Sequence, residues 1–363
     1  MVEKLIYQDK LQFFDYHGIV PFVNVESIQL GLSYKLEPIY GNNAIFSNNH
    51  FKKTGEFLLG PLYECQNETD KKKDVTPNND EITTKETKYY KQFWEDVLYF
   101  CEFCFKYTND EIKFTEHCKI CPYQHNQPGK LVYLGNDYLI KKVSPYRHDV
   151  FLESLCLFTK FFLDNKSSFC NLKEFDFFIV YARELDGISN LRNKPLGFFS
   201  KQIASTHFEN LSSILIVPPY RNRGLGTLLI EFSYHLSIHQ LESSSKMHNS
   251  PNIECFTTGP ESPLSPFGLI MYVNYWQKIL VIEMLNYKQN NKLDIPLIKY
   301  LMEKTHFESE HIILTLKYMK CIKIDTKFNK KYIDWKVISK IYKEKHLKDY
   351  KPTIDKKDLL IYF

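Results

Sequence analysis

Three cysteines and one histidine have the spacing of a metal site. Cys101 and Cys104 are separated by two residues, and His117 and Cys121 follow, separated by three. Two cysteines at i and i+3 can share one turn, and a histidine and a cysteine four apart on a helix face the same side. Three thiolates and one imidazole suit a tetrahedral Zn²⁺ with no open position for catalysis. We therefore predict a structural zinc finger.

Other interpretations of these residues remain open. The two cysteines of the first pair can be buried free thiols, and Cys118 and His125 are competing ligands. We expect Cys118 to point away from the helix side that carries the predicted ligands. Contact between such a finger and DNA is disfavoured by acidic neighbours such as Glu102 and Glu116, which suit a phosphate backbone poorly.

A second chemical pattern runs from Ser212 to Gly226. The apolar run Ile214–Val217 leads into two prolines and then into a loop with two glycines, Gly224 and Gly226. The residues after the loop have the apolar spacing of a helix. Free amides at a helix start, the positive end of the helix dipole and two missing side chains suit a pyrophosphate. An ordinary strand-to-helix connection fits the same pattern.

These residues require a mixed framework of strands and helices. The hydrophobic pattern predicts strands at 131–139, 175–182, 196–201 and 211–217, and helices at 152–163, 224–241, 268–285, 295–304 and 308–317. This order indicates an α/β (α+β) fold with an antiparallel-leaning sheet. Residues 242–258 are expected to form a loop, and 295–325 to form a small winged-helix-like module. The lysine-rich tail 327–351 is predicted to be an amphipathic helix with a solvated face, a nucleic-acid contact being the alternative.

Composition limits the class of protein further. The chain has 363 residues, a 44% apolar fraction, a formal charge of +4 and nine cysteines. Its first residues do not form a secretory signal, and no stretch approaches the ~18 apolar residues of a membrane span. We expect a soluble protein of a reducing compartment, without a full disulfide framework. The charge neither demands nor excludes a nucleic-acid partner.

Four patterns in the same order resemble the MYST family of lysine acetyltransferases. They are the finger C-x2-C-x12-H-x3-C, the helix end Phe161–Lys166, the strand and loop 212–226, and the segment Glu261–Ser265 followed by Gly268 and Tyr275-Trp276. The resemblance also extends upstream to residues 25–40. It implies a GNAT-like acetyltransferase core that binds acetyl-CoA, with an N-terminal C2HC finger and a C-terminal winged-helix-like helical region.

The resemblance implies roles for individual residues. Glu261 matches the general base, and Lys166 matches a lysine that the family acetylates on itself, although an exposed lysine past a helix end fits equally. The remaining matches contact the cofactor: Ile214, Leu215, Ile216, Val217, Arg221, Asn222, Arg223, Gly224, Leu225, Gly226, Thr227 and Ser265. The implied regions are 1–65 (N-terminal part), 66–90 (polar, disordered insert, a domain boundary being the alternative), 91–130 (finger), 131–285 (catalytic core) and 286–363 (C-terminal region).

The expected chemistry agrees with the residue types. A lysine ammonium must lose a proton before it attacks a thioester, so the reaction needs a base that works near neutral pH, and a carboxylate held between prolines, such as Glu261, is a candidate for that base. A surface loop carboxylate is the alternative for this residue. Ser213 stands where many family members have a cysteine, so a covalent acetyl-enzyme is disfavoured. Asn222 also departs from the usual phosphate loop, which places cofactor affinity in question.

The resemblance implies a nuclear histone lysine acetyltransferase that uses acetyl-CoA. Its implied partners are a histone tail (histone 4 or histone 2A), subunits of a chromatin acetyltransferase complex and nucleosomal DNA, with no membrane. A catalytically weakened scaffold subunit of such a complex is the alternative, favoured by Ser213 and Asn222. A DNA-binding finger protein is a third possibility, but it leaves the segment 212–226 unexplained.

Overall fold

The structure, a computed structural model, describes residues 23–42, 45, 95–163, 172–183, 193–204, 209–248, 256–290, 295–325 and 330–361. The chain forms two compact units, each considered by itself. The first comprises residues 1–129, 143–173 and 186–195, and the second comprises 130–142, 174–185 and 196–363. The predicted insert 66–90 and Lys166 lie outside the described residues.

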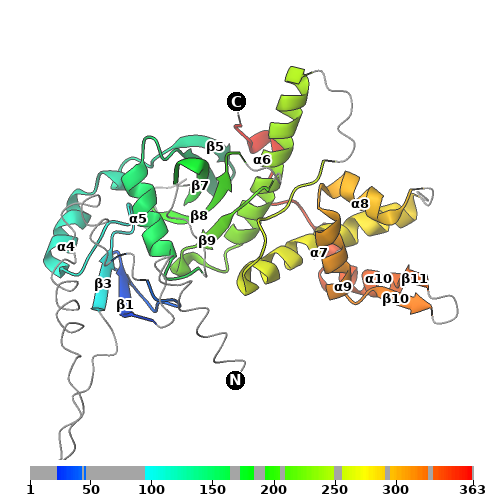
Figure 1. Cartoon of the computed structure of the whole chain (residues 1–363), viewed down its shortest axis with the longest axis horizontal. Helices are drawn as coiled ribbons and strands as arrows, with labels where there is room; N and C mark the ends of the chain where they lie inside the picture. The colour runs from blue at the N-terminus through cyan, green and yellow to red at the C-terminus, as the bar shows by residue number, and fades with distance from the viewer. Residues whose placement is uncertain are drawn as a thin grey trace, which may run out of the picture. The chain divides into compact units, whose positions relative to one another are not determined.

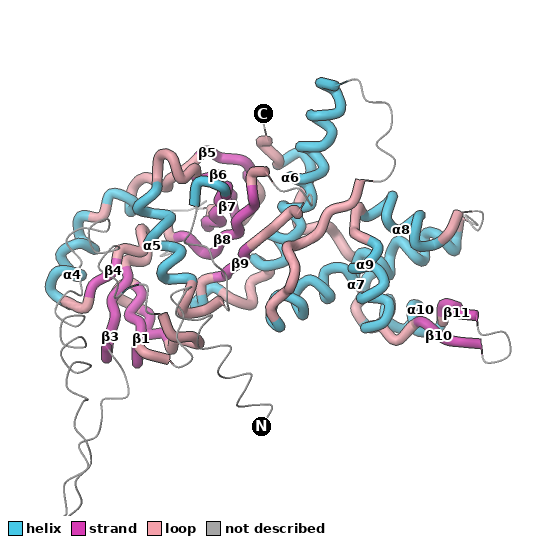
Figure 2. Tube along the Cα trace, viewed as in Figure 1, coloured by secondary structure: helices cyan, strands magenta, loops and turns pink. Residues whose placement is uncertain are grey.

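The first unit contains a four-stranded sheet in the order β2-β1-β3-β4 (Figure 2). Its strands are β1 (Val25–Leu30), β2 (Tyr34–Leu36), β3 (Glu95–Phe100) and β4 (Tyr107–Thr108). Strands β1 and β3 are parallel, with Ile28 opposite Leu98, whereas the β1–β2 and β3–β4 pairs are antiparallel. Three further elements complete the described part of this unit: α4 (Glu111–Ile120), the 3-10 turn η2 (Pro122–Gln124) and α5 (Asp149–Thr159).

Helix α5 ends earlier than its apolar spacing predicts. The predicted helix continued to Leu163, but Phe161 donates to the carbonyl of Phe158 and Phe162 to that of Thr159, so these residues form tighter i→i−3 turns. Phe161, in these turns, is fully buried and packs edge-on against Phe100 of β3. Burial of these rings fixes the end of α5 against the sheet of its own unit.

The second unit contains a five-stranded sheet in the order β5-β6-β7-β8-β9 (Figure 1). Its strands are β5 (Lys130–Leu134), β6 (Tyr138–Val143), β7 (Phe175–Ala182), β8 (Pro195–Gln202) and β9 (Ser213–Ile216). The single strand predicted at 131–139 is wrong, because β5 and β6 form an antiparallel hairpin there. The turn between them contains Gly135, Asn136 and Asp137, residue types that favour turns over strand interiors.

Helices follow the sheet in the chain. They are α6 (Leu225–His248), α7 (Pro266–Gln289), α8 (Leu297–Thr305), α9 (Ser309–Tyr318) and α10 (Trp335–Glu344), with the hairpin β10 (Ile322–Asp325) and β11 (Lys330–Ile333) between α9 and α10. The further 3-10 turns are η3 (Leu172–Glu174), η4 (Pro218–Tyr220), η5 (Leu347–Asp349) and η6 (Lys356–Asp358). Two helices, a hairpin and a third helix agree with a winged-helix-like region.

Two predicted elements need correction. Helix α6 continues past Leu241 to His248, where a loop was expected, because serines and charged residues do not break a helix before Pro251. The predicted tail helix 327–351 is shorter, and Tyr332 lies on strand β11 with 54% of its surface exposed. Ile338 of α10 does pack inside, fully buried among apolar residues of α7 and α9.

Aromatic side chains fill the interior of the second unit. Phe178 of β7 and Phe199 of β8 stack with ring centroids 4.7 Å apart, and Phe232 of α6 packs on both. On α7, Trp276 is fully buried, and its indole nitrogen donates to the hydroxyl of Tyr234 at 2.9 Å. The helices and the sheet therefore hold each other at fixed positions in this unit.

The last described residues close one edge of this sheet. Leu360 donates its amide to the carbonyl of Val132 at 2.8 Å, and Leu359 forms an antiparallel bridge with Tyr133 of β5. Upstream, the buried carboxylate of Glu231 on α6 accepts the amides of Thr353 at 3.0 Å and Ile354 at 3.3 Å. A buried carboxylate needs such donors, so this segment is held at two points.

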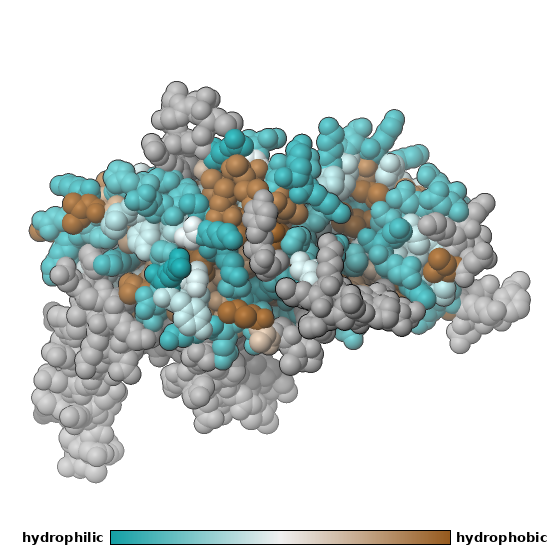
Figure 3. Space-filling view, turned by 90° about the horizontal axis from the view of Figure 1, so that it is seen from above, coloured by the Kyte–Doolittle hydropathy of each residue, from teal (hydrophilic) through white to brown (hydrophobic). Residues whose placement is uncertain are grey.

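On the face drawn in Figure 3, patches of apolar residues lie among hydrophilic ones. Of the helices in the described part of the chain, none combines the length and the hydropathy needed to cross a bilayer.

Candidate functional site

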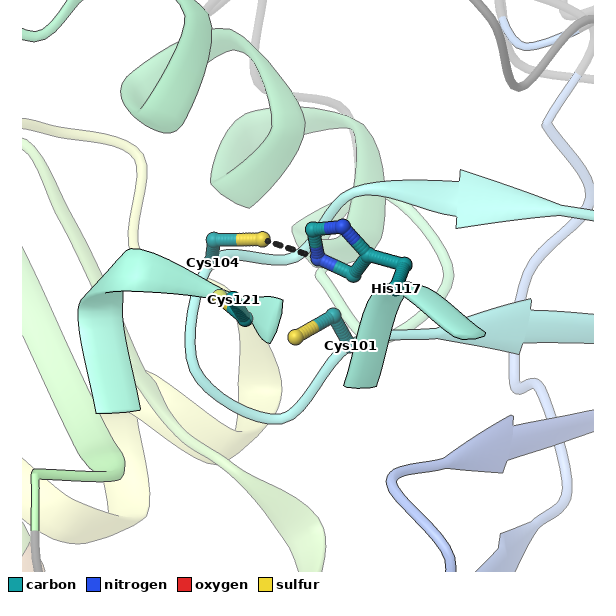
Figure 4. Close-up of side chains that lie close together, drawn as sticks. All are labelled: Cys101, Cys104, His117 and Cys121. Carbon is teal, nitrogen blue, oxygen red and sulfur yellow. Dashed lines mark hydrogen bonds between the residues drawn. The ribbon is translucent and has the colours of Figure 1, made fainter. Parts of the chain in front are cut away.

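The four predicted metal ligands converge in the first unit (Figure 4). The donor atoms of Cys101, Cys104, His117 and Cys121 all lie within 4.8 Å of one another, and the Cys104 sulfur is 3.2 Å from Nε2 of His117. A tetrahedral Zn²⁺ with ~2.3 Å bonds to sulfur places its ligand sulfurs roughly 3.8 Å apart. The three cysteines are almost fully buried. This donor set and spacing therefore fit zinc.

Local backbone geometry places these ligands. Between the first two cysteines and β4 the chain turns sharply: Phe105 has φ of 58°, its amide donates to the Cys101 carbonyl, and the Cys101 amide donates to Lys106. Asp110 caps α4 by accepting the amides of Ile112 and Lys113, which fixes the helix that carries His117. Cys121 is the first residue after α4, so the last ligand comes from the helix end.

Cys118 is buried on α4 close to these residues. In the described part of the chain, however, the donor atoms that lie within 4.8 Å of one another are those of the four predicted ligands, and Cys118 is not one of them. Hydrogen bonds from Cys104, Cys118 and Cys121 hold the pKa of Cys101 well below its usual range, whereas the Cys101 sulfur raises the pKa of Cys104. The first thiolate to form, at Cys101, is stabilised by its neighbours and opposes ionisation of the next thiol. All the ligand thiols can therefore ionise together only when a cation binds them.

In the second unit, β9 is the last strand of its sheet and, among the described residues, presents backbone groups at an open edge. The Val217 amide donates to Leu196 at 3.0 Å, and Leu215 lies opposite Phe198 of β8. Because backbone groups alternate along a strand, Leu215 and Val217 bond to β8, whereas Ile214 and Ile216 direct theirs to the other edge. At that edge, Arg221 Nε donates to the Ile216 carbonyl at 3.3 Å.

The predicted phosphate loop lies directly after β9 and η4. Gly224 has φ of +76° and Asn222 has φ of +63°, a left-handed conformation that glycine and asparagine tolerate best. A methyl group at Gly224 would meet no heavy atom within 4 Å, so open space adjoins the loop. The first helical bond of α6 runs from Leu228 to Gly224, which leaves the preceding amides of residues 225–227 outside the helical ladder.

The structure changes the interpretation of Gly226. Its missing side chain was expected to make room for a phosphate. A methyl group there would instead overlap Sδ of Met271 on α7, so this glycine allows α6 and α7 to approach closely. Arg223 stacks its guanidinium over the ring of buried Tyr220, 5.9 Å from the centroid, whereas the side chains of Leu225 and Thr227 are buried and half-buried.

The segment that carries Glu261 is anchored by its backbone on both sides. The Glu261 amide donates to the Leu211 carbonyl at 2.9 Å, and Leu211 forms a parallel bridge with Pro260. Since Leu211 lies two residues before Ser213, Glu261 is held next to the start of β9. On the other side, Thr258 donates to the His306 carbonyl at 2.8 Å. Glu261 itself is half-buried, and Ser262 and Pro263 are exposed.

A buried histidine supports this segment, and no motif in the sequence indicates it. A methyl group at Gly259 would overlap the His311 ring, so the ring packs directly on the Gly259 backbone. Trp276 stacks on His311 with centroids 4.5 Å apart, and Glu308 lies 3.4 Å from its Nδ1. Desolvation lowers the pKa of His311 to about 4, which keeps the ring neutral.

Two serines near this segment have defined structural roles. Ser265 caps α7 by accepting the amide of Gly268 at 3.1 Å. Ser213 is 8% exposed, and its amide donates to the hydroxyl of Ser200 at 3.2 Å. The predicted cofactor residues and Glu261 therefore come together in one unit.

Comparison with known proteins identifies the class to which this fold and site belong. The family model described as MOZ/SAS family matches residues 126–359, beginning after the Cys and His cluster. The chain is 36% identical over 312 residues to Histone acetyltransferase SAS2 of Saccharomyces cerevisiae, covering 84% of this chain and 77% of the yeast protein. It is 32% identical over 234 residues to Histone acetyltransferase ESA1 of Gibberella zeae, and 29% identical over 224 residues to the Histone acetyltransferase Tip60 homolog of Caenorhabditis elegans.

The extent of the match differs among these relatives. The alignments cover 64% and 62% of this chain, but only 43% of the Gibberella protein and 44% of the Caenorhabditis protein. The family match spans well over half of the chain. This protein therefore belongs to the MOZ/SAS family, which confirms the MYST resemblance indicated by its motifs.

Proposed function

We propose that this protein is a nuclear histone lysine acetyltransferase. It transfers acetyl from acetyl-CoA to the ε-amine of a lysine in a histone tail, histone 4 or histone 2A. The proposal is supported by family membership and by relatives that are named histone acetyltransferases. The observation that carries it is the position of Glu261: its amide bonds to Leu211, two residues before β9, and β9 is the edge strand that leads through η4 into the loop 221–227.

In this proposal backbone groups hold acetyl-CoA. The outward backbone groups of Ile214 and Ile216 bind the acetyl and pantetheine portion, while Leu215 and Val217 keep β9 seated on β8. The loop 221–227 binds the pyrophosphate through amides such as those of residues 225–227, aided by the positive end of the α6 dipole, because the Arg221 amide already donates to the Pro218 carbonyl. Ser265 adds a cofactor contact through its hydroxyl hydrogen, since its oxygen already caps α7. Asn222 fits the left-handed conformation of this loop. An asparagine at this position, although it differs from the usual phosphate loop of the family, is therefore compatible with acetyl-CoA binding.

Glu261 then acts as the general base. Its carboxylate takes a proton from the ammonium of the substrate lysine, and the amine attacks the thioester carbonyl carbon. A C–N bond forms, the C–S bond breaks, and the second proton that the nitrogen loses goes to the thiolate, so that CoA leaves as the free thiol. The attack occurs directly in a ternary complex. A serine hydroxyl is a poor nucleophile unless a base activates it, so no acetyl group passes through the buried Ser213. Lys166 is the candidate for self-acetylation.

The Cys and His cluster holds a structural Zn²⁺ in this proposal. With four protein ligands the ion has no open position, so it supplies folding free energy rather than chemistry. The proposed partners are subunits of a chromatin acetyltransferase complex, and nucleosomal DNA.

Transfer of labelled acetyl from acetyl-CoA to core histones tests the proposal. A Glu261→Gln variant is expected to lose about 10²- to 10⁴-fold in turnover, because general base catalysis contributes that much, while it still binds CoA. A Glu303→Gln variant removes an exposed carboxylate from α8 and is the matched control. Wild-type transfer no greater than that of Glu261→Gln would favour the scaffold alternative. A large loss in Ser213→Ala would overturn the direct mechanism.

A further inference from the structure

A basic pocket lies between the end of α7 and the exposed face of α10. Its volume is about 580 Å³, and its lining comprises Lys288 of α7 and residues of α10: Trp335, Lys336, Ser339, Lys340, Lys343 and Glu344. Four lysines and one glutamate give this lining a formal excess of positive charge. None of the features assigned to acetyl transfer uses these residues.

The fold of α10 determines where these lysines point. Ile338 is fully buried, and Val337 and Ile341 pack partly buried on the same apolar cluster, so this side of the helix faces inward. The exposed positions are 336, 339, 340, 343 and 344, which share the opposite side at helical spacing. Exposed lysines on one side of a helix are by themselves typical of a solvated face.

Lys288 adds a lysine from a second helix, α7, to the lining of the pocket. Its ammonium lies 5.3 Å from the centroid of the Trp335 ring, a cation–π contact that holds it at the side of the pocket. The lysines of two elements therefore converge on one hollow.

Charge repulsion within α10 points in the same direction. Lys336 and Lys340 are four residues apart, and Lys340 and Lys343 are three apart, spacings at which like charges destabilise a helix. The Lys340–Glu344 ion pair, at 3.7 Å with both side chains mostly exposed, offsets little of this. A bound anion would relieve the repulsion.

We propose that this pocket binds the phosphate backbone of double-stranded nucleic acid. The lining contains four lysines against one glutamate, and lysine binds phosphate as a point charge that needs no fixed geometry. From Lys336 to Lys343 the helix rises about 10 Å, while one DNA strand carries a phosphate every ~3.4 Å along the axis. Several phosphates thus fall within reach. Contacts to phosphates carry no base-sequence information, so binding is expected to be independent of base sequence.

This inference does not depend on acetyl transfer and is tested separately from it. Binding of a short fluorescent DNA duplex of mixed sequence to the full chain is measured by anisotropy between about 50 and 200 mM salt. The pocket variant carries Lys288→Gln, Lys336→Gln, Lys340→Gln and Lys343→Gln. Its affinity at low salt is expected to fall at least ~10-fold, and the slope of log Kd against log salt to fall by about 0.9 for each phosphate that a lysine no longer neutralises.

A control variant removes the same charge elsewhere, through Lys113→Gln, Lys119→Gln, Lys299→Gln and Lys304→Gln, all at exposed positions. Its affinity and slope are expected to stay near those of the wild type. Equal losses in the two variants would overturn the proposal, because net charge alone would then explain binding. Displacement of the duplex by a poly-glutamate peptide at lower charge concentration than unlabelled DNA would also overturn it and assign the pocket to acidic peptides.

Two further measurements separate loss of DNA binding from loss of folding. Exposed substitutions of this kind change stability by no more than ~0.5 kcal/mol, and thermal unfolding checks this. If the fourfold variant does not fold, Lys336→Gln and Lys340→Gln are tested singly, and each is expected to lower the slope by about 0.9. Acetyl transfer to a free histone peptide should be unchanged in the pocket variant, so failure of this proposal is distinct from failure of the proposed function.

Discussion

The zinc finger and the region around β9 use different parts of the polypeptide for their chemistry. In the finger, four side chains supply every donor atom, and the backbone only places them. Around β9, the groups proposed to bind acetyl-CoA are amides and carbonyls, and the side chains of Ile214 and Ile216 are apolar. The finger should therefore be sensitive to residue type, and the β9 region to backbone conformation and packing.

Removing a finger ligand should have the largest effect. Cys104→Ala is expected to abolish zinc binding and folding of the first unit, since structural Zn²⁺ contributes about 10–16 kcal/mol in finger peptides. Metal content by mass spectrometry and thermal unfolding measure this. Cys156→Ala, which removes a buried thiol of α5 outside the cluster, should leave the zinc content unchanged. A metal-free wild-type protein with full stability would contradict the view that the finger depends on its ligand side chains.

Acidification should weaken the packing beneath the Glu261 segment. The pKa of His311 is lowered to about 4 in the folded protein against about 6.5 in the unfolded chain. The unfolded state therefore binds the proton first, and stability from this group falls as the pH drops from 6.5 toward 4, by at most about 3 kcal/mol. Urea unfolding of wild type and His311→Gln at several pH values measures it. An identical pH dependence in both proteins would exclude this role of His311.

The two loop glycines should respond differently to alanine. Gly224→Ala places a side chain at φ of +76°, which costs roughly 1–2 kcal/mol and distorts the loop, so we expect the KM for acetyl-CoA to rise about tenfold. Gly226→Ala displaces Met271 instead and should lower the melting temperature more than it raises KM. The opposite ranking would show that Gly226, rather than Gly224, faces the phosphate.

A conservative side-chain change on β9 should have the smallest effect. Ile216→Val removes one methyl group but keeps the strand backbone, so we expect the KM for acetyl-CoA to change less than about twofold, since ~0.4 kcal/mol corresponds to that factor. The same assay of acetyl transfer measures this. A tenfold change would mean that side chains, and not backbone groups, bind the cofactor in this region.

Local signals account for the features that the sequence predicted correctly. The convergence of the three cysteines and His117 could be predicted because their spacing encodes it directly. Strand β7 could be predicted because its apolar run fits a buried strand. The β5–β6 hairpin was missed because Gly135 and its neighbours were included in the apolar run around them. The contact of His311 with Gly259 could not be predicted, because it joins residues about 50 positions apart through packing alone.

The two edges of the five-stranded sheet differ in how they are covered. Leu359 and Leu360 cover the β5 edge, whereas β9 ends the sheet order at the other side with the outward groups of Ile214 and Ile216. An uncovered strand edge is a template on which another chain can add a strand. We therefore expect self-association of the purified protein to begin at β9, and acetyl-CoA, if it binds along this strand as proposed, to act as a protective cap that keeps the protein monodisperse.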